Sequence, residues 1–115
     1  MSNRDCVRFQ HMLDAAQAAI SHLQNKSRKE LDTNRLLLNG VVRELEIIGE
    51  AASQITQATR KKFPELPWKE MIGLRNRLIH AYFDVNVDTI WLVVKESLPP
   101  VIPQLEQILK QLIES

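Results

Sequence analysis

The chain has 115 residues, of which 44% are hydrophobic and 25% are charged. This length and apolar content suit one folded core, so we expect a single domain over residues 1–115 and not a disordered chain. Fifteen Lys and Arg residues against fourteen Asp and Glu residues leave a formal charge of +1. That balance argues against a strongly basic nucleic-acid coat protein, although it permits a local basic groove.

The single cysteine, Cys6, excludes an internal disulfide and a cysteine-based zinc site. The N-terminal residues are charged, at Arg4, Asp5 and Arg8, and do not form the apolar run of a signal peptide. No apolar stretch approaches the roughly 20 residues that a membrane span needs. We therefore expect a cytoplasmic protein with no membrane partner.

Apolar residues recur three and four positions apart through most of the chain, which is the period of an amphipathic helix. The first such stretch predicts a helix over residues 5–24, followed by a polar connection that has room for a short helical turn. A second helix is expected over residues 33–62, with Thr33 or Asn34 as its N-cap. Because this helix is apolar around much of its circumference, we expect it in the bundle core or at a dimer seam. Gly49 would allow another helix to approach it closely.

The second half of the chain is divided by prolines. Residues 63–67 contain two of them and end the second helix. A third helix is expected over residues 68–83, and a last one after Asp84 or Asn86, either of which suits its N-cap. Prolines within residues 99–103 predict a kink or a restart of that last helix. With no strand pattern in view, we predict an all-α fold, a small antiparallel bundle of four to five helices.

The densest group of reactive side chains lies at the end of the predicted third helix, at Arg75, Asn76, His80 and Tyr82. On a continuous helix, Asn76 and His80 would share one face and Arg75 and Tyr82 another. One helix cannot aim all four groups at one point, but a second copy across a two-fold axis could complete a site. Spacing alone does not show that these residues are catalytic, because such residues are often half-buried groups that form hydrogen bonds with nearby carbonyls or carboxylates.

The stretch from Arg75 to Tyr82 has the form R-x4-H-x-Y and resembles the signature of the HepT branch of the HEPN superfamily. Further similarity lies in residues 45–52 (LEIIGEAA), in Pro67-Trp68 before the motif, in residues 87–99 after it, and in Met12-Leu13-Asp14. The resemblance covers nearly the whole chain and is loosest over residues 25–34. No motif position departs from the pattern.

The resemblance implies a HEPN-type bundle that forms a two-fold homodimer and acts as a metal-independent endoribonuclease, the toxin of a toxin–antitoxin pair. Its substrate would be an RNA such as tRNA or mRNA. Arg75 and His80 would be catalytic, with Asn76 at the position of a polar helper. The partner would be an antitoxin similar to the minimal nucleotidyltransferase MntA, which transfers AMP to Tyr82 and silences the nuclease. The chain itself would need no cofactor, since ATP and Mg²⁺ belong to the partner enzyme.

Elementary chemistry agrees with these roles. Metal-free cleavage of RNA needs a base, an acid and positive charge on the phosphate. An imidazole such as that of His80 can transfer protons near neutral pH. The Arg75 guanidinium is permanently charged and can donate two parallel hydrogen bonds to a phosphate. One motif histidine per chain leaves one proton-transfer role vacant, which a composite site at a dimer interface would fill. A phenol is a poor base at neutral pH, so regulation suits Tyr82 better than catalysis.

Charge is unevenly distributed along the chain. Residues 26–77 hold eleven basic and seven acidic residues, a local charge of +4, whereas residues 78–115 hold two and five, a local charge of −3. Two basic clusters stand out, Lys26-Arg28-Lys29 and Arg60-Lys61-Lys62. Each could be a solvated helix end or could grip RNA phosphates. We expect weak RNA binding from Lys61, Lys62 and Arg77.

Other interpretations stay open at this level. Glu46 and Glu50 lie four residues apart and, with His80, could hold a metal ion. A dimetal site needs more ligands than this chain gathers, so we expect no metal and expect these carboxylates to pair with Arg43, or with Arg75 and Arg77.

The chief alternative function is a non-catalytic helical subunit that binds substrate for a two-component nucleotidyltransferase, and a third is a plain dimerisation domain. The grouping of Arg75, His80 and Tyr82 favours the nuclease over both, because a scaffold needs neither an imidazole nor a guanidinium at that spacing.

Overall fold

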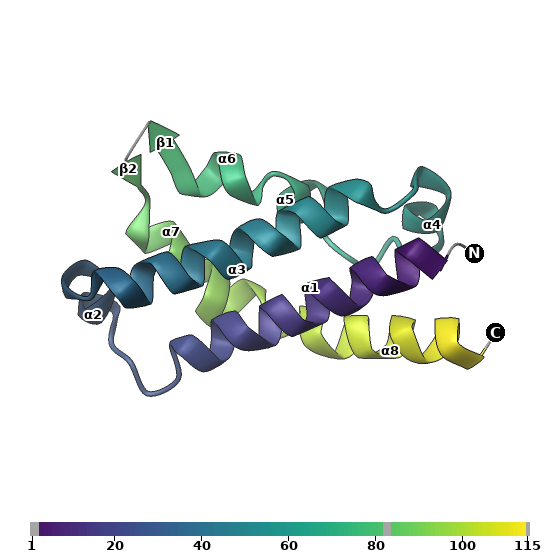
Figure 1. Ribbon diagram of the computed structural model, residues 1–115, viewed down its shortest axis with the longest axis horizontal. Helices are drawn as coiled ribbons and strands as arrows, with labels where there is room; N and C mark the ends of the chain where they lie inside the picture. The colour runs from purple at the N-terminus through teal and green to yellow at the C-terminus, as the bar shows by residue number, and fades with distance from the viewer. Residues whose placement is uncertain (1–2, 82–83, 115) are drawn as a thin grey trace.

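The computed structural model describes residues 3–81 and 84–114, with the backbone alone described at residues 3, 75, 78–81 and 84–85. Two long helices, α1 (Asn3–His22) and α3 (Arg35–Gln54), run antiparallel and side by side along a molecule 46 Å in its longest dimension (Figure 1). The last helix, α8 (Val101–Glu114), packs against α1. The predicted all-α class is confirmed.

Within the described residues, no helix combines the length and the apolar character needed to cross a lipid bilayer.

The core forms where the apolar stripes of these helices meet. Its fully buried side chains from α1, α3, α7 (Val87–Leu92) and α8 include Phe9, Met12, Leu45, Ile48, Ile90, Leu105 and Ile108. The Phe9 ring meets the edges of Phe63 and Trp68 with centroid distances of 5.8 and 5.9 Å. Burial of each such side chain contributes about 1.5–3 kcal/mol, so this cluster fixes how the helices stack.

Local capping signals place the helix starts. Asn34 is the N-cap of α3, where its side chain accepts a hydrogen bond from the Leu37 amide at 3.0 Å. Asn86 caps α7 (Val87–Leu92) in the same way, accepting from Thr89 N at 3.0 Å. Both are among the predicted caps. The polar connection before α3 holds one short helix, α2 (Arg28–Thr33).

The predicted second helix is shorter than expected. It ends at Gln54, because Ile55 is extended and Thr56 starts a new helix, α4 (Gln57–Lys62), by accepting the Thr59 amide on its hydroxyl. The break is stabilised from elsewhere in the chain, since the buried Asp5 carboxylate of α1 receives hydrogen bonds from Thr56 and Thr59. The expectation of one helix over residues 33–62 was therefore wrong at this corner.

The predicted third helix is also divided. It comprises α5 (Trp68–Ile72) and α6 (Leu74–Leu78), separated by a turn at Gly73, a poor helix former. After Leu78 the chain is extended in β1 (Ile79–Ala81), which pairs antiparallel with β2 (Asp84–Val85). The expected helix through residue 83 was thus wrong over residues 79–81, where the β-branched Ile79 begins a stretch that suits a strand; residues 82–83 lie outside the described residues.

The last predicted helix restarts at its prolines, as expected. After α7 the chain widens into a π-helical segment, η1 (Val93–Ser97), passes through a turn at Leu98, Pro99 and Pro100, and continues as α8. Pro103 is the third residue of α8, in the first turn, where amide hydrogens lack a helical partner.

Candidate active site

The described residues of the R-x4-H-x-Y motif come from two elements. Arg75 and Asn76 belong to the short helix α6, and His80 belongs to β1, two residues after α6 ends. Tyr82 lies outside the described residues. The prediction that Asn76 and His80 share one helix face was therefore wrong, because His80 is not helical. The motif instead crosses a helix-to-strand junction. The pairing of β1 with β2 fixes the path of the backbone after this junction.

Helix α3 packs closely against the chain just before the motif. The contact is made at Gly49, whose lack of a side chain predicted such an approach. A Cβ at Gly49 would lie 3.1 Å from the Met71 carbonyl oxygen and 3.9 Å from the Leu74 Cβ. Only a glycine lets α3 come this close to the end of α5 without displacing it. The close approach sets the position of α6 relative to the α3 carboxylates.

Beside α6 this contact leaves an open hollow of about 230 Å³. It is lined by Glu46, Gly49, Glu50, Ser53, Ile72 and Asn76. The exposed Asn76 amide shares this space with two carboxylates and a hydroxyl, all groups that can hydrogen-bond a ribose or a phosphate-bound water. Sequence reasoning singled out Asn76 but missed Ser53, whose place depends on the approach of α3 to α5.

The carboxylates of this hollow are not paired as expected. No ion pair between described side chains involves Glu46 or Glu50, so the expected pairing with Arg43 or Arg77 is absent. Pairing with Arg75 falls outside the described side chains. No group of three His, Cys, Asp or Glu residues within the described part of the chain is arranged to hold a metal ion.

Comparison with known proteins identifies the family. The sequence family described as "Ribonuclease HepT-like" matches residues 12–108, which include the whole motif. The chain belongs to the HepT-like ribonuclease family. The resemblance to the HepT branch of the HEPN superfamily is thus confirmed, and so is the assignment of a ribonuclease.

The HepT-like chain has close relatives over almost its full length. It is 41% identical over 107 residues to a protein of Methanocaldococcus jannaschii named as a putative RNase, covering 92% of this chain and 98% of that protein. A protein of Caldanaerobacter subterraneus with the same description is 34% identical over 103 residues, covering 90% and 92% of the two chains. A protein of Thermococcus cleftensis named "Probable ribonuclease HepT" is 46% identical over 70 residues, covering 61% and 64%. No solved structure matches the chain significantly.

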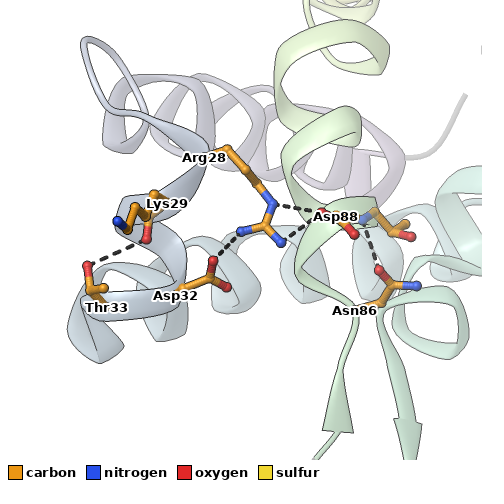
Figure 2. A network of polar contacts seen from close by, with 7 residues as sticks. Arg28, Lys29, Asp32, Thr33, Asn86 and Asp88 are labelled. Atoms are coloured by element: carbon orange, nitrogen blue, oxygen red, sulfur yellow. Dashed lines mark hydrogen bonds and ion pairs between the residues drawn. The ribbon is translucent and has the colours of Figure 1, made fainter.

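Each of the two basic clusters contains an arginine that is committed to the fold of this HepT-like chain. Figure 2 shows Arg28 of α2 between two carboxylates: Nη1 lies 2.8 Å from Asp32 Oδ2, and Nη2 lies 2.7 Å from Asp88 Oδ1 of α7. The hydrogen bond to Asp88 raises the pKa of Arg28 further. This pair ties α2 to the first turn of α7, directly after the β1–β2 segment that carries His80.

Arg60 has a comparable structural role at the opposite end of α3. Its guanidinium donates to the carbonyl oxygens of Ser53 at 2.8 Å and Ile55 at 3.0 Å, and lies 6.0 Å from the centre of the Trp68 ring. It therefore satisfies carbonyls that α3 leaves unpaired at its C-terminus. The exposed lysines Lys61 and Lys62 lie on α4, at the other end of the molecule from β1 (Figure 1). One protomer does not bring them together with the motif.

The corner between α3 and α4 contains a buried carboxylate, Asp5, which is only 1% exposed. Its Oδ2 accepts hydrogen bonds from Thr59 Oγ1 at 2.7 Å and Thr56 Oγ1 at 3.0 Å. Burial alone would raise the pKa of Asp5, but the hydrogen bonds from Thr59 and Thr56, helped by the nearby Arg8, outweigh it and hold the pKa below its ordinary value. The carboxylate is thus stabilised in its charged form and fastens α1 to the start of α4.

Proposed function

We propose that this HepT-like chain is the metal-independent endoribonuclease toxin of a toxin–antitoxin pair. The observation that carries the proposal is the family match over residues 12–108, which spans an intact R-x4-H-x-Y motif. The exposure of Asn76 and Arg77 on α6 supports it, because RNA could reach this helix from solvent.

The proposed chemistry is an in-line attack within the RNA. The 2′-oxygen forms a bond to the adjacent phosphorus as its proton passes to a base, and the bond from phosphorus to the 5′-oxygen breaks as an acid protonates the leaving oxygen. The products carry a 2′,3′-cyclic phosphate and a 5′-hydroxyl. His80 transfers protons, Arg75 holds the phosphate oxygens that gain charge, and Asn76 orients the phosphate or the ribose.

A homodimer supplies what one chain lacks. A single motif contains one imidazole, whereas the reaction uses a base and an acid. Two motifs facing one cleft across a two-fold axis would provide two copies of His80 and Arg75. The polar hollow that holds Asn76 would then open onto the cleft between the protomers.

Regulation would act at Tyr82, which a cognate minimal nucleotidyltransferase would modify. The phenol oxygen attacks the α-phosphorus of ATP, pyrophosphate leaves, and an AMP group remains on the tyrosine through a phosphodiester bond. ATP and Mg²⁺ are bound by the partner enzyme. The added anion would compete with RNA phosphate for Arg75, while its nucleoside would obstruct the cleft.

The proposal is tested by producing the chain with and without the candidate nucleotidyltransferase. We expect a mass increase of one or more AMP groups on the peptide that contains Tyr82, together with loss of RNA cleavage. Expression of the chain alone should arrest growth, and His80→Ala should relieve the arrest. An accessory subunit without nuclease activity would instead be harmless alone, with or without His80, and this outcome would refute the proposal.

A further inference from the structure

A second pocket lies beside α6, distinct from the hollow that contains Asn76. Its volume is about 200 Å³. Its inner wall is apolar and at most 5% exposed, formed by Met71, Leu74, Val93, Leu98 and Val101. Its rim carries three exposed polar side chains, Glu70, Arg77 and Ser97. Nothing in the proposed cleavage chemistry uses this pocket.

Helix α6 separates the two depressions. Asn76 lines the polar hollow on one side, and the next residue, Arg77, lines the apolar pocket on the other. An α-helix with its side chains is about 10 Å across, a distance that a single RNA strand covers in a few nucleotides. A strand whose phosphate lies at the polar hollow beside Asn76 therefore has a neighbouring nucleotide within reach of this pocket.

The far wall of the pocket is built by the π-helical segment η1. The Leu98 amide donates to the Val93 carbonyl at 2.8 Å, the five-residue spacing of a π-helix. Val93, Ser97 and Leu98 all line the pocket because this wider turn brings residues four and five apart onto one side. Such turns are frequent at binding sites, where they create space that a regular helix would fill.

The rim has the chemistry to recognise a nucleotide. No ion pair between described residues involves Arg77 or Glu70, so both charges are available to a ligand. A guanidinium binds phosphate oxygens, while the Glu70 carboxylate and Ser97 hydroxyl can accept hydrogen bonds from the edge of a base. The volume is below the ~300–1,000 Å³ of pockets for drug-sized ligands, which favours a single flat ring system.

We propose that this pocket binds one unstacked base of the RNA strand, with Arg77 on the phosphate of the same nucleotide, and so selects where the chain cuts. The inference rests on the proposed nuclease function for its role in cleavage. Base binding itself is a separate property, because it needs neither His80 nor Arg75. Unstacked bases inserted between apolar side chains and read along their edges are an established mode of nucleic-acid recognition.

Binding is measured on the full-length protein by methyl NMR, with the four nucleoside 5′-monophosphates as separate ligands. We expect at least one of them to shift the methyl signals of Leu74, Val93 and Val101 in a saturable way. Ribose 5-phosphate, which lacks a base, should not do so. The pocket-filling variant Ser97→Phe should weaken the best ligand by at least about tenfold, and Arg77→Gln should remove the preference for the nucleotide over its nucleoside. The matched control is Glu96→Phe, an exposed neighbour that does not line the pocket.

The results separate this inference from the proposed function. The inference is overturned if no nucleotide shifts these methyl signals, or if Ser97→Phe, shown to be folded by its NMR spectrum, binds as tightly as Glu96→Phe. If the protein binds bases but does not cleave RNA, the proposed nuclease function is refuted and the inference that the pocket binds a base still stands. For an active nuclease, we expect Ser97→Phe to redistribute the cut sites on a mixed-sequence RNA; an unchanged pattern contradicts the selecting role.

Discussion

Among single residues, the buried Asp5 carboxylate gives the most specific prediction about the stability of the fold. Replacement by Asn should destabilise the fold by about 1–3 kcal/mol, because buried threonine hydroxyls lose a charged acceptor. The pKa of Asp5 is lowered in the folded chain, so its stabilisation is present above the pKa of the unfolded chain and is lost as the pH falls below about 4. Urea unfolding at pH 7 and at pH 3 measures both effects.

The control for this prediction is Asp14→Asn on the same helix. Asp14 is exposed and accepts one hydrogen bond, from Gln10 Nε2 at 2.9 Å. Its replacement should change the free energy of unfolding by no more than about 0.5 kcal/mol at either pH. Equal effects of the two substitutions at pH 7 would show that the Asp5 carboxylate does not fasten the α3–α4 corner.

A single substitution at Tyr82 tests the proposed regulation. Tyr82→Phe removes the hydroxyl that would accept AMP and leaves the proposed proton-transfer groups in place. We expect the variant to cleave RNA and to remain active when ATP and the nucleotidyltransferase are added. Intact-mass spectrometry beside the cleavage assay measures this. A variant that the partner still silences would place the modification elsewhere.

At the scale of helices, the contact between α3 and α5 controls the position of α6. In an isolated helix, Gly→Ala stabilises by about 1 kcal/mol. At Gly49 the new methyl group would meet the Met71 carbonyl at 3.1 Å, so we expect Gly49→Ala to destabilise by about 1–3 kcal/mol and to lower the cleavage rate.

Gly40 provides the matched comparison within the same helix. A Cβ there would contact only the His22 ring, at 3.8 Å, an ordinary van der Waals distance. Gly40→Ala should therefore stabilise α3 by up to about 1 kcal/mol and leave cleavage unchanged. Thermal unfolding and initial cleavage rates of the two variants test the pair. Similar behaviour of both would mean that the approach at Gly49 does not position the site.

The helices also show what sequence patterns can predict. Helical periodicity and capping residues are local, so the class of fold, the caps Asn34 and Asn86 and the restart at the prolines were predictable. The break at Ile55 was not, because the hydrogen bonds that stabilise it are donated by Thr56 and Thr59 to Asp5, about fifty residues away. The extended segment at His80 was missed because a Leu-Ile-His-Ala run fits helix or strand, and its pairing with β2 decides. The apolar pocket likewise depends on α5, α6, η1 and α8 together.

The net charge of the protein as a whole is close to zero, but its charged residues are unevenly distributed. Arg28 and Arg60 are engaged by the fold, and Lys61 and Lys62 lie far from β1. Arg77 lies within the motif, and its side chain forms no ion pair with a described residue. We expect Arg77→Gln to weaken RNA binding and to reduce the slope of log affinity against log salt by about 1. Combined replacement of Lys61 and Lys62 by Gln should have the smaller effect; a larger one would contradict this arrangement.

The central claim is that the motif of this HepT-like chain cleaves RNA without a metal ion. The most direct measurement is the rate of RNA cleavage in excess EDTA by the wild-type chain, by His80→Ala, and by His11→Ala as an exposed histidine outside the motif. We predict wild-type and His11→Ala cleavage that leaves 2′,3′-cyclic phosphate ends, and a loss of about 100-fold or more for His80→Ala. Cleavage by His80→Ala at the wild-type rate, or none by any chain without added metal, would contradict the account.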